Sequence, residues 1–194
     1  VLAKSGVNVP LGKLLTNESR QALTALSFPL IAKPVDGCGS EGIQRITSDG
    51  ELDRLPIDGT LRLERYVRGL PVSVAVLCGP AGDLALPAAQ QKLSGDGRFT
   101  YLGGALPLAE QLDRRARNLA ARAVAELGTR IGYVGVDLIL GESPSGSTDY
   151  VIEINPRLTT SYVGLRAAAR SNLAAAMLEV ARGRQPELCI AERT

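Results

Sequence analysis

GVDLIL at residues 135–140 and YVIEINPR at residues 150–157 are two stretches rich in Val, Ile and Leu, a composition typical of β-strands. The segment between them, GESPSGSTD at residues 141–149, consists of Gly, Ser, Pro, Thr and acidic residues with nothing to bury, which is typical of a turn. The sequence therefore predicts a β-hairpin. Its apolar side chains, which we expect to be buried, are Val136, Leu138, Val151, Ile152 and Ile154.

Oxygen-bearing side chains gather on one face of this predicted hairpin. If the hairpin is symmetric about Ser145, Asp137 lies opposite Glu153, and Asn155 points the same way as Glu153 because strand side chains alternate between faces. Two carboxylates and an amide oxygen are hard ligands that suit Mg²⁺, which also keeps waters and phosphate oxygens. A half-exposed hairpin with one polar face explains the pattern equally well.

The composition excludes several classes of site. The 194 residues contain no His, which rules out a Ser-His-acid triad and His-ligated zinc. A net charge of +2, with two Phe, five Tyr and no Trp, argues against a nucleic-acid partner. No apolar run has the length of a membrane span, and the three widely spaced Cys favour a reduced, cytoplasmic setting. Catalysis must then rely on carboxylates, Lys, Arg, backbone amides or a metal.

Strands and helices are mixed along the chain, and hairpins outnumber strand-helix-strand crossovers, which predicts an α+β fold with antiparallel sheets. The predicted strands are 28–33, 43–46, 61–66, 71–78, 84–93 and 99–102, and the predicted helices are 18–26, a short one after Ser48, 110–127 and 171–181. The residue pattern of the sequence changes at Gly69, which predicts two domains, 1–69 and 70–194. Because the first residue is Val and not Met, we interpret the chain as a fragment. The sequence does not specify an oligomeric state, and a homodimer is compatible with it.

Two predicted helices have a clear inward face. In 110–127 the apolar face is Leu112, Ala116, Leu119, Ala120, Ala123, Val124 and Leu127, and the opposite face is Arg114, Arg115, Arg117 and Arg122. In 171–181 the inward residues are Leu173, Met177, Leu178 and Val180.

The loop GCGSEG at residues 37–42 matches the pattern G-x-G-x-x-G. It is followed by a predicted strand and not by the helix that a dinucleotide-binding fold requires. A strand-loop-strand flap presents backbone amides to phosphate, and Lys33 just before it supplies positive charge to the same phosphates. The loop residues expected to bind phosphate are Gly37, Gly39, Ser40 and Gly42. A surface hairpin with an ordinary exposed lysine is the alternative.

The segment Glu64-Arg65-Tyr66-Val67 leaves the first predicted domain and turns into the second, which makes it a natural hinge. Hinge backbone groups can bind an adenine edge while apolar side chains enclose the ring. An edge strand with mixed charge explains this segment equally well.

Taken in this order, these features resemble the ATP-grasp superfamily, and the resemblance runs from Lys33 to Arg157. It implies two α+β lobes with antiparallel sheets that grip ATP, and an N-terminal substrate domain that would precede Val1. It also implies a role for each candidate residue. Lys33 would contact the ATP phosphates, Glu64, Tyr66 and Val67 would form the adenine-binding hinge, Asp137, Glu153 and Asn155 would bind Mg²⁺ or Mn²⁺, and Arg157 would hold phosphate or the acyl phosphate.

The activity implied by the resemblance is ATP-dependent joining of a carboxylate, such as that of glutamate, to an amine. The reaction proceeds through an acyl phosphate and releases ADP and phosphate. Residues 91–104 and 155–166 are similar to the branch of carboxylate–amine ligases related to tyramine–glutamate ligase. Gln91, Thr160 and Tyr162 are the candidate substrate contacts, and helix capping or core packing is the alternative for them.

Two positions depart from the family pattern. Many members carry an acid two residues after the hinge glycine, where this chain has Pro71. Members of the D-alanine ligase type carry an arginine where this chain has Gly135, which we expect opposite Asn155, leaving room beside the metal. These departures keep open a non-catalytic ATP-binding module. A carboxylase-type lobe is a separate alternative, although such enzymes usually use further Arg and Lys positions that this sequence does not show.

Overall fold

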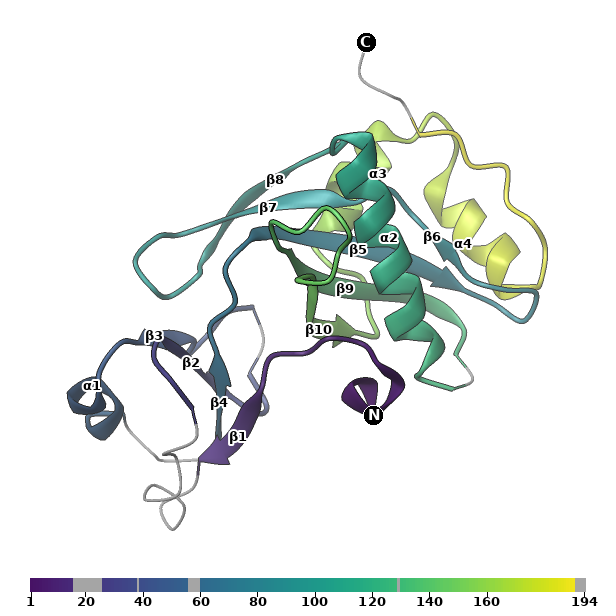
Figure 1. Ribbon diagram of the computed structural model, residues 1–194. Helices are drawn as coiled ribbons and strands as arrows, with labels where there is room; N and C mark the ends of the chain where they lie inside the picture. Colours follow the sequence, from purple (N-terminus) through teal and green to yellow (C-terminus); the bar gives the residue numbers. More distant parts are fainter. Residues whose placement is uncertain (16–25, 38, 56–59, 129, 191–194) are drawn as a thin grey trace. The chain divides into compact units, whose positions relative to one another are not determined.

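The computed structural model describes residues 1–15, 26–37, 39–55, 60–128 and 130–190 (Figure 1). The strands are β1 (Gly12–Leu15), β2 (Leu30–Pro34), β3 (Gln44–Ile46), β4 (Leu61–Arg65), β5 (Leu70–Cys78), β6 (Leu84–Ala85), β7 (Ala89–Leu93), β8 (Tyr101–Ala105), β9 (Gly132–Leu140) and β10 (Tyr150–Asn155). The helices are the 3-10 helix η1 (Leu2–Ser5) and the α-helices α1 (Asp49–Asp53), α2 (Glu110–Ala125), α3 (Ser161–Ala168) and α4 (Leu173–Ala181). The predicted helix 18–26 lies outside the described residues except for its last position.

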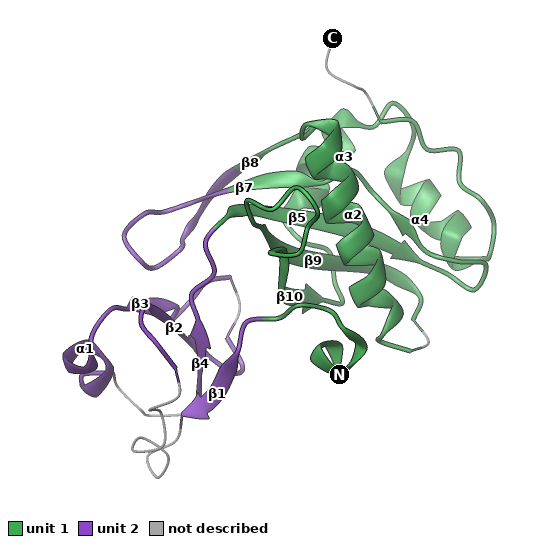
Figure 2. Cartoon of the chain, in the orientation of Figure 1, with its two compact units in different colours: residues 1–9, 69–91, 104–194 green, residues 10–68, 92–103 purple. Residues whose placement is uncertain are grey.

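The chain forms two compact units (Figure 2). Unit 1 comprises Val1–Val9, Gly69–Gln91 and Gly104–Thr194, and unit 2 comprises Pro10–Arg68 and Lys92–Gly103. The division into domains 1–69 and 70–194 stays a prediction. Among the described helices, none is long and apolar enough to cross a membrane.

Unit 2 is built on a four-stranded antiparallel sheet in the order β1-β4-β2-β3. Strands β2 and β3 pair with Leu30 opposite Ile46, which confirms the predicted strand-loop-strand arrangement around residues 37–42. Ser48 caps α1 as predicted, by accepting a hydrogen bond from the Glu51 N–H. Strand β1 was not predicted. The buried core of this unit is Leu15, Leu30, Ala32, Ile46, Leu52, Leu55 and Leu63.

The main sheet has the strand order β10-β9-β5-β7-β8, with β6 also paired to β5. Its two nine-residue strands, β5 and β9, pair along their full length. Because side chains alternate, one face of this pair is wholly apolar and packs against α2. The strand residues on that face are Val72, Val74, Val76, Val134, Val136 and Leu138, and the helix residues are Ala116, Leu119, Ala120, Ala123 and Val124.

The opposite face of β5 and β9 is apolar at one end and becomes polar further along the strands. Ala75, Leu77 and Tyr133 pack with side chains of α3 and α4, including Leu165, Leu173 and Val180. The next cross-strand pair on this face is Ser73 opposite Asp137, and it is polar. The antiparallel α+β fold is thus confirmed, and it places one polar pair, Ser73 and Asp137, on a face of these two strands that is otherwise apolar.

The helices differ from the sequence prediction in three respects. Helix α2 ends at Ala125, and Leu127 beyond it is 44% exposed. Leu178 was predicted to face inward but is 56% exposed, because α4 buries Leu173, Ala176 and Val180 at helical spacing on its other side. Helix α3 was not predicted from the sequence. It contains Gly164, which weakens a helix, and it buries Leu165.

Candidate functional site

The β9–β10 hairpin has the register predicted from its sequence. Glu153 lies opposite Asp137, and Asn155 lies opposite Gly135. A β-bulge between Val151 and Glu153 shifts the register by one residue toward the loop. The two carboxylates therefore come from directly paired positions of neighbouring strands, and Asn155 follows two residues after Glu153 on the same strand.

Asp137 lies in an environment that disfavours its charge. Its carboxylate accepts hydrogen bonds from Gln91 Nε2 at 3.0 Å and from Asn155 Nδ2 at 3.3 Å. Burial raises the pKa of Asp137 to about 6, and the charge of Glu153 adds to the increase, while Ser73, Gln91 and Arg157 act in the opposite direction. Two adjacent carboxylates, one of them poorly solvated, form a site that a cation would stabilise.

The raised pKa gives a testable dependence of stability on pH. Because Asp137 binds its proton more tightly in the folded state, its ionisation destabilises the metal-free fold as pH rises from about 4 to about 6. The free energy of unfolding of Asp137→Asn should therefore equal that of the wild type near pH 4. Above pH 7 it should be larger by on the order of 2 kcal/mol. Urea unfolding in a chelator at several pH values measures this difference, and a gap independent of pH would contradict it.

Asn155 connects Asp137 to Arg157. It is 6% exposed, donates from Nδ2 to Asp137, and accepts at Oδ1 from Arg157 Nη2 at 3.1 Å. The amide oxygen thus faces Arg157, and binding a cation beside Asp137 through this oxygen requires the amide to turn. Arg157 is exposed and also donates to the Leu158 carbonyl.

Gly135 does not leave open space beside the site, so that prediction was wrong. A Cβ at this position would come within 2.3 Å of Thr159 Cγ2, because the chain after β10 folds back onto the sheet there. Thr159 Oγ1 is held 3.1 Å from the Tyr133 hydroxyl and 2.8 Å from Ser161 Oγ. Glycine is required at 135 to admit this returning segment.

The three candidate substrate contacts lie in different settings. Gln91 is hydrogen-bonded to Asp137 itself. Thr160 is exposed at the N-cap of α3, where its side chain makes no capping hydrogen bond. Tyr162 packs edge-on against Tyr133, with ring centroids 6.2 Å apart, and lines an open pocket with Arg166 and residues 171–174.

In unit 2, the structure brings Lys33 and Glu64 together. Lys33 Nζ lies 2.8 Å from Glu64 Oε2, and Arg62 Nε lies 2.5 Å from the other oxygen. Glu64 is only 6% exposed, and its buried carboxylate is paired with both the Lys33 and the Arg62 cations. Of the two other hinge residues, Tyr66 stacks on Phe99 at 6.1 Å and Val67 is half-buried.

Three residues of the flap adopt left-handed backbone conformations, which favour glycine. Gly39, Ser40 and Gly42 have φ values of 64°, 65° and 73°, and a Cβ at Gly42 would come within 2.8 Å of Pro34. Gly37 packs beside the same proline. Lys33, the flap and the hinge therefore form one set within unit 2, and Asp137, Glu153 and Asn155 form another within unit 1.

The donor set on the hairpin fits a magnesium ion. Over the described part of the chain there is no cluster of three or more His, Cys, Asp or Glu side chains suited to a metal. The hairpin instead offers two carboxylates and one amide, which leaves coordination positions for waters and phosphate oxygens, as Mg²⁺ prefers.

Comparisons with known proteins identify relatives of the chain. A family model described as an ATP-grasp domain matches residues 1–161. Tyramine–L-glutamate ligase of Methanocaldococcus fervens is 29% identical over 136 residues, covering 70% of this chain and 40% of that protein. D-alanine–D-alanine ligase of Oleidesulfovibrio alaskensis is 34% identical over 161 residues, covering 74% of this chain and 50% of that protein.

Solved structures show the same fold. N5-carboxyaminoimidazole synthetase from Staphylococcus aureus, complexed with ADP, superimposes with a TM-score of 0.80 at 18% identity, covering 97% of this chain and 52% of that chain. The chain thus spans about half the length of the proteins it matches.

Proposed function

Because the chain belongs to the ATP-grasp family, we propose that it forms the ATP- and Mg²⁺-binding part of a ligase that joins a carboxylate to an amine. The reaction would pass through an acyl phosphate and release ADP and phosphate. The observation that carries this proposal is the in-register pairing of Asp137 with Glu153, with Asn155 hydrogen-bonded to Asp137. The names of the two curated relatives, a tyramine–L-glutamate ligase and a D-alanine–D-alanine ligase, support the amine and carboxylate classes.

The residues of unit 1 would hold the metal and the reacting group. Asp137, Glu153 and Asn155 supply the protein ligands for Mg²⁺, which Mn²⁺ could replace. When bound, the ion neutralises negative charge on phosphate oxygens. Arg157, exposed next to Asn155, would bind the transferring phosphate or the acyl phosphate through charge-assisted hydrogen bonds.

The residues of unit 2 would hold the nucleotide. The flap at residues 37–42 would bind phosphate through backbone amides, and Lys33 would add a positive charge. The ion pair with Glu64 holds the Lys33 ammonium, so phosphate would have to share or replace that partner. Glu64, Tyr66 and Val67 would enclose and bind the adenine.

Substrate contacts are proposed at Gln91, Thr160 and Tyr162. Gln91 already donates to Asp137, so it would orient that carboxylate as well as face the substrate. Tyr162 and Thr160 lie at the start of α3, just beyond Arg157.

The proposal is tested by measuring ADP release from the full-length protein with Mg²⁺ and ATP, across amino acids paired with amines. We expect ADP release only when a carboxylate and an amine are both present, with glutamate and tyramine as the first pair to test. Nucleotide binding without ADP release for any pair would instead indicate a non-catalytic module, and release dependent on bicarbonate would indicate carboxylase-type chemistry.

A further inference from the structure

One buried hydroxyl lacks the partner that the other buried polar side chains have. Among the described residues, four with a polar or charged side chain are buried: Glu64, Ser73, Asp149 and Asn155. Glu64 is paired with two cations, and Asn155 bonds to Asp137 and Arg157. Of the four, only Ser73 has a side-chain oxygen without a hydrogen-bond partner in the described part of the chain. A buried unpaired hydroxyl is unfavourable, so Ser73 stands out in a fold that satisfies the others.

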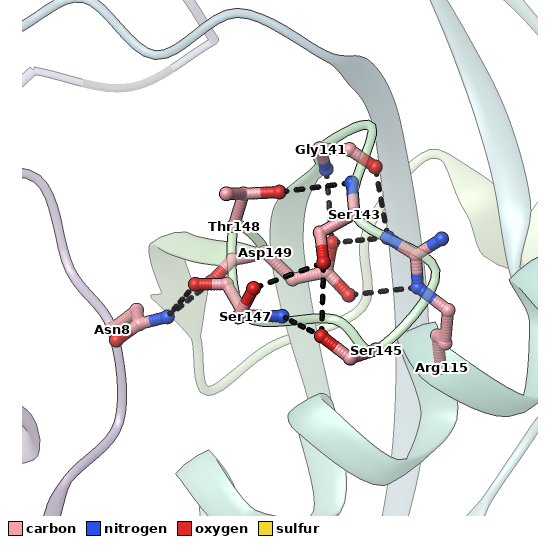
Figure 3. Close-up of polar contacts among 8 residues, drawn as sticks. All are labelled: Asn8, Arg115, Gly141, Ser143, Ser145, Ser147, Thr148 and Asp149. Atoms are coloured by element: carbon pink, nitrogen blue, oxygen red, sulfur yellow. Dashed lines mark hydrogen bonds and ion pairs between the residues drawn. The ribbon is translucent and has the colours of Figure 1, made fainter.

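Asp149 shows how completely such a group is satisfied elsewhere (Figure 3). Arg115 donates from Nε to Asp149 Oδ2 at 3.1 Å and from Nη2 to Asp149 Oδ1 at 2.5 Å. The same guanidinium donates to the Gly141 carbonyl at 2.9 Å, and the Gly141 N–H donates to Asp149 at 2.9 Å. The loop at 141–149 was predicted to bury nothing, and Arg115 was predicted on the outward face of its helix. Both predictions were wrong, because the carboxylate and the guanidinium bury each other.

Ser73 lies next to the first of the proposed metal ligands. It is on β5 directly opposite Asp137 of β9, so the two side chains share one face of the sheet. Strand β7 lies on the other side of β5, where Ala89 is the partner of Ser73. The Gln91 side chain therefore crosses β5 near Ser73 to donate to Asp137. The 3% exposed Ser73 hydroxyl is thus enclosed beside the Asp137 carboxylate.

Asn155 contacts the same carboxylate with its nitrogen, which cannot bind a metal. Its Nδ2 donates to Asp137 Oδ2 at 3.3 Å, while its Oδ1 accepts from Arg157. When the amide turns to present Oδ1 to a cation beside Asp137, the carboxylate loses the Nδ2 donor and keeps the hydrogen bond from Gln91. Asp137 then has room for another donor, and a free hydroxyl lies directly opposite it.

We propose that Ser73 is a positioning residue of the metal site, whose hydroxyl replaces the Asn155 amide as a hydrogen-bond donor to Asp137 when Asn155 turns its oxygen to the metal. This inference rests on the proposed function. One exchange accounts for both the nitrogen that Asn155 presents to Asp137 and the unpaired hydroxyl of Ser73. Because a hydroxyl hydrogen rotates to suit its acceptor, the exchange needs no movement of the strands.

The test compares Ser73→Ala with Ser161→Ala in the full-length protein. Ser161 is the matched control because its hydroxyl already contacts Tyr133 and Thr159 without a metal. Urea unfolding in a chelator measures the stability of the metal-free fold. Mn²⁺ titration with a non-hydrolysable ATP analogue, followed by EPR, measures the metal site. With Mg²⁺ in place of Mn²⁺, the NMR signals of the Asn155 side-chain amide report whether it turns.

We expect Ser73→Ala to unfold at the same urea concentration as the wild type or at a higher one, because it loses no hydrogen bond in the metal-free state. It should nevertheless bind Mn²⁺ about tenfold more weakly, as for the loss of one hydrogen bond to a charged group. Ser161→Ala should show the reverse, with a lower urea midpoint and an affinity for Mn²⁺ within about twofold of the wild type.

Wild-type affinity for Mn²⁺ in Ser73→Ala would overturn this inference and leave the proposed function intact. The same holds if the Asn155 side-chain amide signals stay unchanged when Mg²⁺ and the analogue bind. A lower urea midpoint for Ser73→Ala would also overturn it, because the hydroxyl would then already act in the metal-free protein. A wild-type protein that binds no Mn²⁺ contradicts the proposed function itself, and this inference with it.

Discussion

Asp137→Asn is expected to abolish amine-dependent ADP release while making the metal-free protein more stable. The substitution removes a negative charge from the proposed metal site, and the loss of rate should be at least roughly a hundredfold, as for removal of a principal electrostatic contact. The same change removes the cost of keeping a half-buried carboxylate ionised at neutral pH. Loss of activity therefore cannot be ascribed to unfolding.

Glu153→Gln is the matched control for this prediction. Glu153 is exposed, so its substitution should remove activity with a smaller gain in stability, which comes only from relief of its repulsion of Asp137. ADP release under saturating ATP and urea unfolding in a chelator measure the two effects. Retained turnover in both variants would show that Asp137 and Glu153 do not bind the metal.

Gly135→Ala is expected to destabilise the protein and to reduce activity together. The added methyl group would lie 2.3 Å from Thr159 Cγ2, and such overpacking costs about 1–3 kcal/mol. Because Thr159 follows Arg157 closely in the chain, displacing it shifts the segment that carries Asn155 and Arg157. Chemical unfolding and ADP release should both show the loss.

Thr159→Ser provides a specific rescue of Gly135→Ala. Serine lacks the Cγ2 atom that clashes, but it keeps the hydroxyl that contacts Tyr133 and Ser161. The double variant should recover most of the stability, and the two substitutions should therefore be strongly non-additive. A double variant no more stable than Gly135→Ala would show that the steric account of Gly135 is wrong.

The sequence was sufficient to predict features that depend on local pattern. The pairing of Asp137 with Glu153 follows from two apolar strands around a turn-rich segment, and the amphipathic helix α2 follows from its spacing. The α+β class follows from the number of hairpins.

Features that depend on distant partners could not be predicted in this way. Arg115 and Asp149 are 34 residues apart, and neither pattern alone shows that they bury each other. The space beside Gly135 is filled by Thr159 only because the chain returns onto the sheet after β10. The bulge between Val151 and Glu153 likewise follows from no pattern in the strand sequence.

The most direct test of the metal site proposed on the β9–β10 hairpin is paramagnetic broadening of backbone amide signals by Mn²⁺ with a non-hydrolysable ATP analogue. The account predicts that the signals of Asp137, Glu153 and Asn155 broaden first, and that this selectivity disappears in Asp137→Asn. Sharp signals at these three positions under saturating Mn²⁺ and nucleotide, with broadening elsewhere in the protein, would contradict it.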